Sequence, residues 1–582
     1  MDRAEAVTEA GESAAKERFW RKAGIILVVL TGVLYFARLG ARALWASEFR
    51  WAEIAREMIL TRNYFWPTIN GHLYYDKPLG SYWLVVASTY LTGGMNEAAA
   101  RFPSAVAGLI AVMLLIGLAR DLYDLRTGVI AATILATSFS FVFFSRHADA
   151  DAITVTGELA ALWLFWRNQA NPSGRWLIPF WLLMAVTSLM KGLLGFVLPL
   201  VVVGSYCTLA DGLAGLKDDL RRGSLLDRLI ALIKRNRWFF NWYTPLAVVL
   251  SMVTYYWPFA ISYEKTGSIS GLYMVYRENV QRFFDPFDHV GPIYLYVYVI
   301  FGLMAPWSVF LPAGLWRAHA GSPSSDDETR SDRFVLIFFW VVFLFFTASG
   351  SRRSYYLLPI LPAASIIVAR LFIAPFAVLP RWSFQLLKLG FALLGIAVAL
   401  SFIGLVPPRL YLPGKFALMP NAPDQPILIL YLVGAALGVA IAIGRRFTPL
   451  RIFFASATIS WLFMFYFYVF AMPAGDAWRG EKSFAHQVRA IIGADTDGLA
   501  FFDNTGPAYY LELPKPVPSL STKRELEAGI KAGKIRWIVT LNRDLGRLEF
   551  PNEIVARELV NPWDSKEHEG NSMILVHVIP KT

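Results

Sequence analysis

Ionisable side chains stand in a few short polar segments between the apolar runs of this chain, and their types define the chemistry open to it. Carboxylates in such segments can accept a proton or orient a nucleophile, and clustered cations bind phosphate-bearing anions. A charge at the boundary of an apolar run is costly unless it is paired or functional. The candidate acids and cations are Glu48, Asp149 and Asp151, and Arg50, Lys77, Arg146, Lys191, Arg352 and Arg353.

The composition identifies the chain as a membrane protein. Of its 582 residues, 56% are hydrophobic and only 17% are charged, and the mean hydropathy is +0.45. The formal net charge of +12 comes from cations in short segments between apolar runs, where such residues set membrane orientation. No nucleic-acid partner is therefore expected. Cys207 is the single cysteine, which excludes an intrachain disulfide.

About 20 apolar residues cross a bilayer, and apolar runs of roughly that length recur along most of the chain. We predict an α-helical polytopic membrane protein that begins with a polar tail, residues 1–22, which is not a cleavable signal. The predicted transmembrane region, residues 23–472, contains thirteen helices near 23–40, 102–119, 128–146, 152–167, 176–190, 193–210, 243–261, 291–316, 334–349, 355–374, 385–406, 427–444 and 452–472.

The distribution of basic residues predicts the orientation. The sequence GSYWLVVASTYL, residues 80–91, is predicted to lie along the membrane interface as part of a catalytic loop over residues 41–101. This loop is predicted to contain interfacial helices, because the charged residues of SEFRWAEIAREM, residues 47–58, stand at helical spacings. With that assignment, every strongly basic segment falls on the side of the tail, which the positive-inside rule makes cytoplasmic. The opposite, periplasmic face then receives the loop 41–101, the turns at 146–151 and 349–354, Lys191-Gly192 and residues 473–582.

The last hundred or so residues change character. Apolar runs of strand length begin at Gly498, Ile535 and Met573, and an amphipathic helical pattern begins at Thr522. Residues 473–582 are therefore predicted to form a small soluble α/β domain on the periplasmic side.

The order of motifs along the chain resembles a known class of enzymes. SEFRWAEIAREM, YYDKPLGSYW, NEAAARFPSAVAG, SRHADAD, LMKGLLGFVLPL, YRENVQRFF, HVGPIYLY and SGSRRSYYLLPILPA follow one another between residues 20 and 375. This order is similar to that of the GT-C membrane glycosyltransferases, above all the aminoarabinose lipid A transferases and the protein-mannosyltransferase-like group, glycosyltransferase families 83 and 39. The resemblance implies transfer of a sugar from a polyprenyl-phosphate carrier to a lipid or protein acceptor in the bacterial inner membrane.

The resemblance also implies roles for acidic residues. The first loop of the family opens with an Asp-Glu pair, whereas this chain has Ser47-Glu48. The second acidic motif is retained at Asp151, five residues after Arg146. Two alternatives follow for the missing carboxylate: Glu48 suffices by itself, or the acceptor is already ionised, as a lipid phosphate is.

The sequence contains a few candidate ligands for a divalent metal. Some relatives associate zinc with a glutamate before the conserved lysine and with a histidine in a later loop, and here these positions hold Asp76 and Asn279. Lys77 itself is retained, and His289 lies further along the later loop. Asp76 and His289 are thus the metal candidates, Asp285 and Asp288 lie in the same loop as His289, and no cofactor is required by the pattern.

The chemistry of such a transfer assigns the remaining residues. Displacing a sugar from a phosphate carrier needs cations for the charge that develops on the leaving phosphate. A hydroxyl acceptor also needs a carboxylate base, and a single displacement inverts the anomeric centre. We predict Glu48 and Asp151 as catalytic. We predict Lys77, Lys191, Arg352, Arg353 and Tyr355 as ligands of the donor phosphate. Substrate positioning is assigned to Arg50, Tyr75, Tyr82, Arg146 and Asp149.

The functional hypothesis is therefore an inverting glycosyltransferase that acts on lipid A or another glycolipid. A protein O-glycosyltransferase and a transporter of lipid-linked intermediates are the alternatives. The hypothesis requires Glu48, Lys77, Asp151 and Arg352 to gather around one cavity at the external leaflet.

Overall fold

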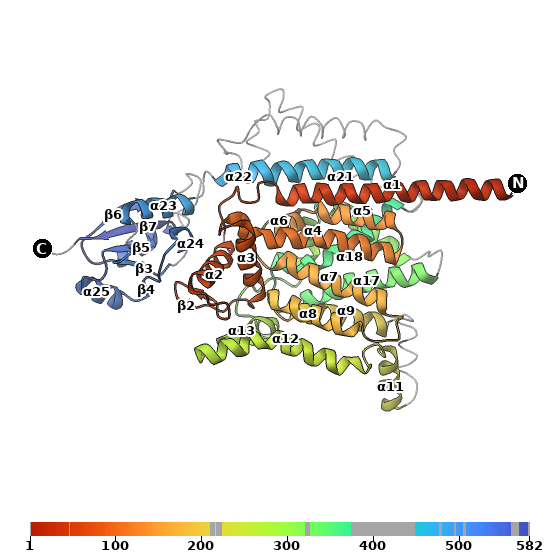
Figure 1. Cartoon of the computed structure of the whole chain (residues 1–582), viewed down its shortest axis with the longest axis horizontal. Helices are drawn as coiled ribbons and strands as arrows, with labels where there is room; N and C mark the ends of the chain where they lie inside the picture. Colours follow the sequence, from red (N-terminus) through yellow and green to blue (C-terminus); the bar gives the residue numbers. More distant parts are fainter. Residues whose placement is uncertain are drawn as a thin grey trace, which may run out of the picture.

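The computed structural model describes residues 2–45, 47–209, 216, 224–320, 326–373, 449–476, 480–493, 496–504, 508–559 and 570–579. A bundle of long, nearly parallel helices makes up most of the molecule, and a mixed β-sheet lies beyond one end of it (Figure 1). The N-terminus lies at the opposite end of the bundle.

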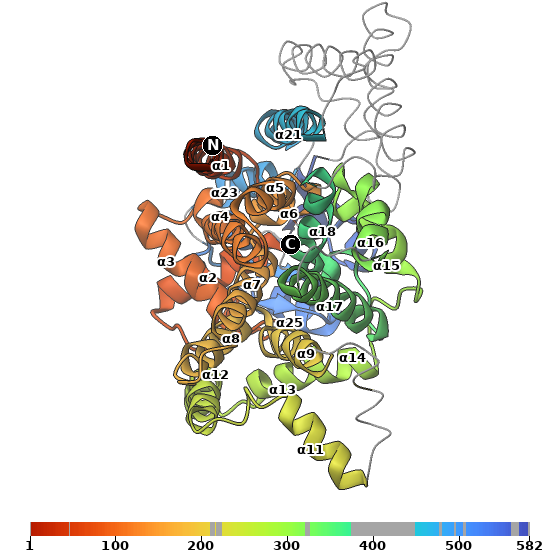
Figure 2. The ribbon, with the colours of Figure 1, turned by 90° about the vertical axis from the view of Figure 1, so that its right-hand side faces the viewer.

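The core of the bundle is built from apolar helices that alternate in direction. Viewed along the helices, α4, α5, α7 and α18 lie inside, and α1, α12 and α16 lie outside (Figure 2). The bundle helices are α1 (Asp2–Phe36), α4 (Glu97–Leu122), α5 (Leu125–Ala136), α6 (Phe139–Ser145), α7 (Asp151–Asn168), α8 (Leu177–Lys191), α9 (Leu194–Thr208), α11 (Leu225–Arg235), α12 (Tyr243–Thr266), α15 (Leu295–Leu303), α16 (Leu311–Ala320), α17 (Asp326–Ala348), α18 (Leu361–Ile373) and α21 (Pro449–Tyr466).

Six of the described helices are long and apolar enough to cross a membrane, and a bent pair makes a seventh. They coincide with the predicted spans that begin near residues 23, 102, 128, 243, 334, 355 and 452. The predicted spans over 176–190 and 193–210 are the shorter apolar helices α8 and α9, of 15 residues each. The spans predicted over 385–406 and 427–444 lie outside the described residues.

Three predicted helix boundaries were wrong, each because of an identifiable residue or contact. Residues 128–146 form two helices, α5 and α6, bent by 72°, because Ser138 Oγ donates back to the Ile134 carbonyl and the Phe139 amide donates to the Ala305 carbonyl. The span 291–316 is divided into α15, the 3₁₀ turn η2 (Trp307–Phe310) and α16, next to Pro306, which cannot continue a helix. Helix α4 begins at Glu97, because Asn96 caps it by accepting from the Ala99 amide.

The first loop contains two helices and a short hairpin at the end of the bundle away from the N-terminus (Figure 1). They are α2 (Glu48–Thr61), β1 (Thr68–Ile69), β2 (His72–Leu73) and α3 (Gly80–Thr92). Helix α2 is amphipathic and buries Trp51, Ile54, Ala55 and Met58. Helix α3 has 13 residues and is too short to span a membrane, so this segment does not reverse the direction of the helices that follow.

The C-terminal region forms a five-stranded sheet with the strand order β4-β3-β5-β7-β6. Strand β3 is parallel to β4 and β5, and β7 is antiparallel to β5 and β6. Strands β3, β5 and β7 lie at the predicted apolar runs and α25 at the predicted amphipathic helix, whereas β4 and β6 were not predicted. The elements are α23 (Glu481–Ile492), β3 (Leu499–Phe502), α24 (Ala508–Leu511), β4 (Ser519–Leu520), α25 (Lys523–Lys531), β5 (Trp537–Leu541), β6 (Asn552–Arg557) and β7 (Met573–Val578).

The sheet is fastened to the first loop through a buried asparagine. Asn70 has φ +51° and is 2% exposed, and its side chain accepts from the Val517 amide at 2.9 Å and donates to the Val517 carbonyl at 2.7 Å and to Ser519 Oγ at 2.6 Å. At the adjacent Gly71, with φ +76°, a Cβ atom would lie 2.6 Å from Pro516. This close backbone approach holds the sheet against the loop that carries α2.

Replacing Asn70 with alanine is expected to loosen this junction. The change removes three buried hydrogen bonds and leaves the Val517 backbone unsatisfied, at a cost of about 1–3 kcal/mol. We expect faster limited proteolysis between the bundle and the sheet, with the bundle fragment remaining intact. The exposed Asn171 provides a control, and equal cleavage rates for N70A and N171A would contradict this account.

Candidate active site

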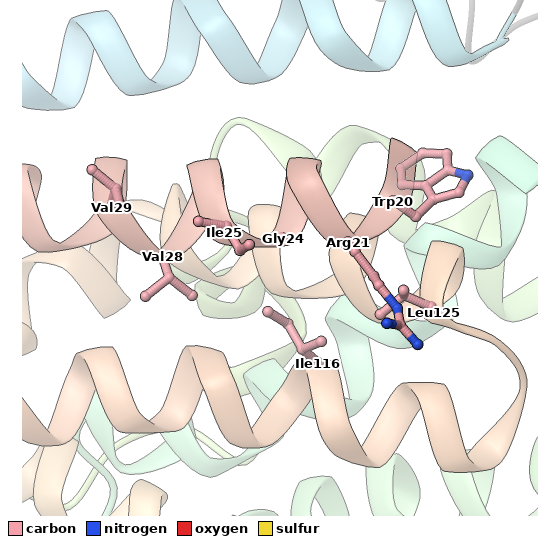
Figure 3. Close-up of a pocket in the computed structure, with 8 residues that line it drawn as sticks. All are labelled: Trp20, Arg21, Gly24, Ile25, Val28, Val29, Ile116 and Leu125. Atoms are coloured by element: carbon pink, nitrogen blue, oxygen red, sulfur yellow. The ribbon is translucent and has the colours of Figure 1, made fainter. Parts of the chain in front are cut away.

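Polar clusters occupy the end of the bundle that carries α2 and α3, and the basic segments occupy the other end. The start of α1 lies at the basic end, where the Arg126 guanidinium is 5.9 Å from the Trp20 ring centroid. An apolar groove of about 420 Å³ opens there between α1 and the α4–α5 pair (Figure 3). Its lining contains one ionisable residue, Arg21, so this groove offers no constellation for catalysis.

Glu48, at the first position of α2, is buried and fully occupied by neighbours. Its two oxygens form a fork with Arg101 of α4, at 2.7 Å to Nε and 2.7 Å to Nη2. They also accept from the Trp45 amide at 2.8 Å and the Ala148 amide at 2.9 Å, and Oε1 lies 3.2 Å from His147 Nδ1. Burial alone would raise the pKa of Glu48, but the charges of Arg101 and His147 hold it well below its usual range.

These contacts change the interpretation of Glu48. A carboxylate that accepts five hydrogen bonds and has a depressed pKa is a poor proton acceptor. Glu48 therefore links α2, α4 and the turn after α6, and its predicted role as a catalytic base becomes, in our proposal, a positioning role.

Two predicted ligands of substrate or phosphate direct their guanidinium groups to the backbone instead. Arg146 donates to the carbonyls of Tyr35 at 3.0 Å and Ala37 at 2.9 Å, so it caps the C-terminal end of α1. Arg352 donates to the carbonyls of Thr347 and Gly291, the latter at 2.7 Å. The sequence could not separate these arginines from Arg353, because all three stand at helix ends on the same face.

The turn before α7 joins the second acidic motif to a lysine. Asp151 forms a buried ion pair with Lys191 at the end of α8. The Lys191 ammonium also lies 5.5 Å from the ring centroids of Tyr355 and Tyr356, a cation–π distance. Asp149 accepts from the Asp151 amide at 2.9 Å and so supports the start of α7. The structure thus brings together Asp151, Lys191 and Tyr355 from three separate elements.

The second cluster surrounds Lys77. Its ammonium lies 3.3 Å from the Asp76 carboxylate and 3.5 Å from Glu278 Oε2. On the other side of Asp76, Arg50 of α2 approaches to 2.8 Å and also donates to Tyr74. Burial would raise the pKa of Asp76, but the charges of Lys77 and Arg50 lower it. The lysine predicted to bind phosphate therefore sits in a partly buried network of two acids and two cations.

A short π-helix, η1 (Arg277–Gln281), follows α13 (Ser270–Tyr276) and contacts Lys77 and the backbone just after Lys191. Glu278 pairs with Lys77 and with Arg282, and Asn279 accepts from the Leu193 amide at 2.8 Å, directly after Lys191-Gly192. Such helices are often found at functional sites. Glu278 and Arg282 stand in the motif YRENVQRFF, but sequence analysis assigned neither a role, because their partners Lys77 and Asp288 can be found only in the fold.

The contacts continue around this end of the bundle. Arg282 pairs with Asp288 at 2.7 Å, Asp288 lies 3.2 Å from His289, and Arg353 contacts both His289 and Tyr355. We call the set that runs from α2 to α7 the polar ring. Its members are Arg50, Asp76, Lys77, Glu278, Arg282, Asp288, His289, Arg353, Tyr355, Lys191 and Asp151.

Glu48 begins α2, the helix that carries Arg50, and contacts His147 of the turn before α7. Two predicted positioning residues lie outside the ring. Tyr75 forms a hydrogen bond with Ser262 of α12. Tyr82 is 1% exposed and packs against Trp51, so it belongs to the core beneath α2.

A metal at Asp76 and His289 does not fit this arrangement. Asp76 is engaged with Arg50 and Lys77, and His289 is engaged with Asp288 and Arg353. Within the described part of the chain, no group of three or more histidine, cysteine or acidic side chains is placed to hold a metal ion. No step of the mechanism is therefore assigned to a metal.

Asp149 gives a testable pH dependence. Burial, and then the charge of Asp151, raises the pKa of Asp149 from 3.8 to about 8. Because the folded state holds this proton more tightly than the unfolded chain, stability is expected to fall as the pH rises from about 4 to 8, by up to about 1.4 kcal/mol per pH unit.

Replacing Asp149 with asparagine should remove this dependence of stability on pH. Melting temperatures followed by tryptophan fluorescence from pH 5 to 9 are expected to decline less steeply for D149N than for the wild type. Parallel curves would show that Asp149 does not titrate in this window.

Comparison with solved structures places the fold in a class. The crystal structure of ArnT from Cupriavidus metallidurans bound to undecaprenyl phosphate superimposes with a TM-score of 0.68, covering 95% of this chain and 97% of that one at 18% identity. Its apo form gives a TM-score of 0.65. The architecture is therefore that of the GT-C membrane glycosyltransferases.

Sequence comparison identifies the relatives that this chain resembles within the class. The undecaprenyl phosphate-α-4-amino-4-deoxy-L-arabinose arabinosyl transferase of Pectobacterium carotovorum is 28% identical over 410 residues, 67% of each chain. That of Pseudomonas aeruginosa is 26% identical over 460 residues, 76% of this chain and 74% of the relative. The family model of dolichyl-phosphate-mannose-protein mannosyltransferases matches residues 76–214. The protein is a membrane glycosyltransferase that resembles the aminoarabinose transferases.

Proposed function

We propose that the protein transfers a sugar from a polyprenyl-phosphate donor to a lipid acceptor, lipid A or another glycolipid, at the periplasmic face of the inner membrane. The observation that carries this proposal is the polar ring, which collects cations from α2, the first loop, α8, α14 (Arg282–Phe284) and the segment before α18 at one end of the bundle. Fixed cations that face a leaving phosphate lower the barrier to its departure.

The reaction follows from the charges of the ring. Lys77, Lys191 and Arg353 hold the donor phosphate, exchanging part of their contacts with ring acids for contacts with phosphate oxygens. The acceptor oxygen attacks the anomeric carbon while the bond from that carbon to the phosphate oxygen breaks. Because the displacement is single, the anomeric configuration inverts.

The proposed orientation follows from the basic end of the bundle. The N-terminal part of α1 and helix α11 lie at the end of the bundle opposite α2 and α3 (Figure 1), and both carry lysine and arginine residues. The positive-inside rule places that end in the cytoplasm and the polar ring, with the C-terminal sheet, in the periplasm. The donor and acceptor follow from the aminoarabinose transferases, whose names specify an undecaprenyl phosphate-linked sugar.

Transfer by the purified protein tests the proposal. The protein in liposomes is supplied with undecaprenyl-phosphate sugars and with lipid A, and the products are analysed by mass spectrometry. A gain of one sugar mass on lipid A is expected, with the opposite anomeric configuration to the donor. Donor movement across the bilayer without transfer would support a transporter and overturn the proposal.

A protein acceptor is the second candidate, because the mannosyltransferase family model covers residues 76–214, which contain Lys77, Asp151 and Lys191. Lipids and periplasmic proteins from cells with and without the gene distinguish the two. A sugar mass on extracted lipid supports the glycolipid acceptor, and one on serine or threonine peptides supports the alternative.

A further inference from the structure

We propose that His147 is the general base of this enzyme, taking the proton from an acceptor hydroxyl, and that Glu48 orients it. This inference rests on the proposed transferase function and deepens it by naming the class of acceptor group. It begins from the hydrogen bonds of Glu48. This carboxylate accepts from Arg101 and from two backbone amides, and the residue before it, Ser47, has no carboxylate.

The geometry around His147 is that of an oriented base. His147 lies in the turn between α6 and α7, where its Nδ1 is 3.2 Å from Glu48 Oε1 and its Nε2 is 3.5 Å from Ser47 Oγ. Its ring stacks on Phe143, with centroids 5.1 Å apart and planes at 24°. A ring nitrogen next to a carboxylate carries the proton, so the lone pair of the neutral imidazole is on Nε2, on the side of Ser47.

The position of Ser47 shows where the hydroxyl of a substrate would lie. Ser47 is partly exposed, whereas His147 is 8% exposed, so the Nε2 atom is reached from the side of the serine. A serine-histidine-carboxylate series of this kind activates a hydroxyl when the histidine is held by the acid. Here the hydroxyl of an acceptor that approaches past Ser47 would meet the same nitrogen.

The charged groups around His147 suit this role. It faces Glu48 of α2, Arg101 of α4 and Asp149 of its own turn. Burial lowers the pKa of His147, but the charge of Glu48 and the hydrogen bond to it outweigh this effect and raise the pKa. A group with a raised pKa takes up a proton more readily than one with a depressed pKa, so His147 suits the role of base better than Glu48 does.

The step balances without a further reactant. The acceptor O–H bond breaks and its proton goes to Nε2, while the acceptor oxygen bonds to the anomeric carbon. The bond from that carbon to the donor phosphate breaks, and its electron pair leaves on the phosphate oxygen. The imidazolium is stabilised by Glu48 and returns its proton to water. The acceptor group is therefore a hydroxyl, not an ionised phosphate.

Replacing His147 with glutamine tests the proposal, because the amide keeps a donor towards Glu48 but has no basic nitrogen. We expect the kcat/KM for transfer to a hydroxyl acceptor to fall about 100-fold or more, while undecaprenyl phosphate binds as in the wild type. The exposed His486 of α23 provides the matched control, H486Q. In the wild type, kcat/KM should rise with pH through the pKa of His147, and this limb should be absent in H147Q.

A second variant keeps the test independent of damage to the fold. Adding S47D to H147Q places a carboxylate within reach of the same hydroxyl, and transfer should recover about tenfold or more. Transfer by H147Q within about threefold of the wild type, or an unchanged acidic limb, would overturn the role of His147 alone. Lack of transfer by the wild type would instead overturn the proposed function and this role with it.

Discussion

Replacing Arg101 with alanine is expected to destabilise the folded protein by about 3–5 kcal/mol, because it leaves Glu48 charged, buried and without its main partner. The Arg101 side chain is 3% exposed, and besides the fork to Glu48 it donates to the carbonyls of Leu39, Arg42 and Ala43. The variant should melt many degrees below the wild type in detergent and lose the fixed start of α2.

Two further variants sharpen this prediction. R101K keeps the charge but cannot form the two-bond fork, so it should recover only part of the lost stability. R175A removes an exposed arginine and should leave the melting temperature unchanged. A melting temperature of R101A equal to that of the wild type would mean that the Glu48–Arg101 pair does not hold α2 in place.

Replacing Lys77 with alanine is expected to reduce sugar transfer about 100- to 1,000-fold, which is the effect of removing one preorganised charge from a developing anion. The lysine lies between Asp76 and Glu278, so its removal also leaves two acids facing each other across the ring. Donor affinity should fall as well, and transfer and binding of undecaprenyl phosphate are measured together.

The control for Lys77 is Lys265, a lysine of α12 with 57% of its side chain exposed. K265A should transfer sugar at the wild-type rate. If K77A and K265A have the same activity, the polar ring does not contact the donor, and the site must lie elsewhere on the chain.

Local patterns were sufficient to predict most elements. The charged and apolar spacing of residues 47–58 predicted a helix, and α2 runs from Glu48 to Thr61. The apolar runs at Gly498, Ile535 and Met573 became β3, β5 and β7. These predictions succeed because the alternation of buried and exposed positions in a helix or strand can be recognised in consecutive residues. The break at Ser138 was missed because it depends on Ala305, which is distant in sequence.

The candidate site was predictable in its residue types but not in its pairings. Lys77, Lys191 and Asp151 were recognised because charge is rare in such an apolar chain. Their partners come from residues 40 to 201 positions away, and no local rule identifies Glu278 as the partner of Lys77. The role of Arg101 was not predicted for the same reason. This residue lies in α4, and its side chain binds Glu48, which is more than 50 residues earlier in the chain.

The π-helix η1 makes the surroundings of Lys77 dependent on the length of the chain. A π-helical turn contains one residue more than the α-helical turn it replaces, so deleting Val280 would let the segment close as an ordinary α-helix. The separation of Glu278 and Arg282 along the chain would then fall from four residues to three, which changes the geometry of their ion pair. Insertions and deletions within η1 would thus change the charges that surround the proposed donor site without replacing a charged residue.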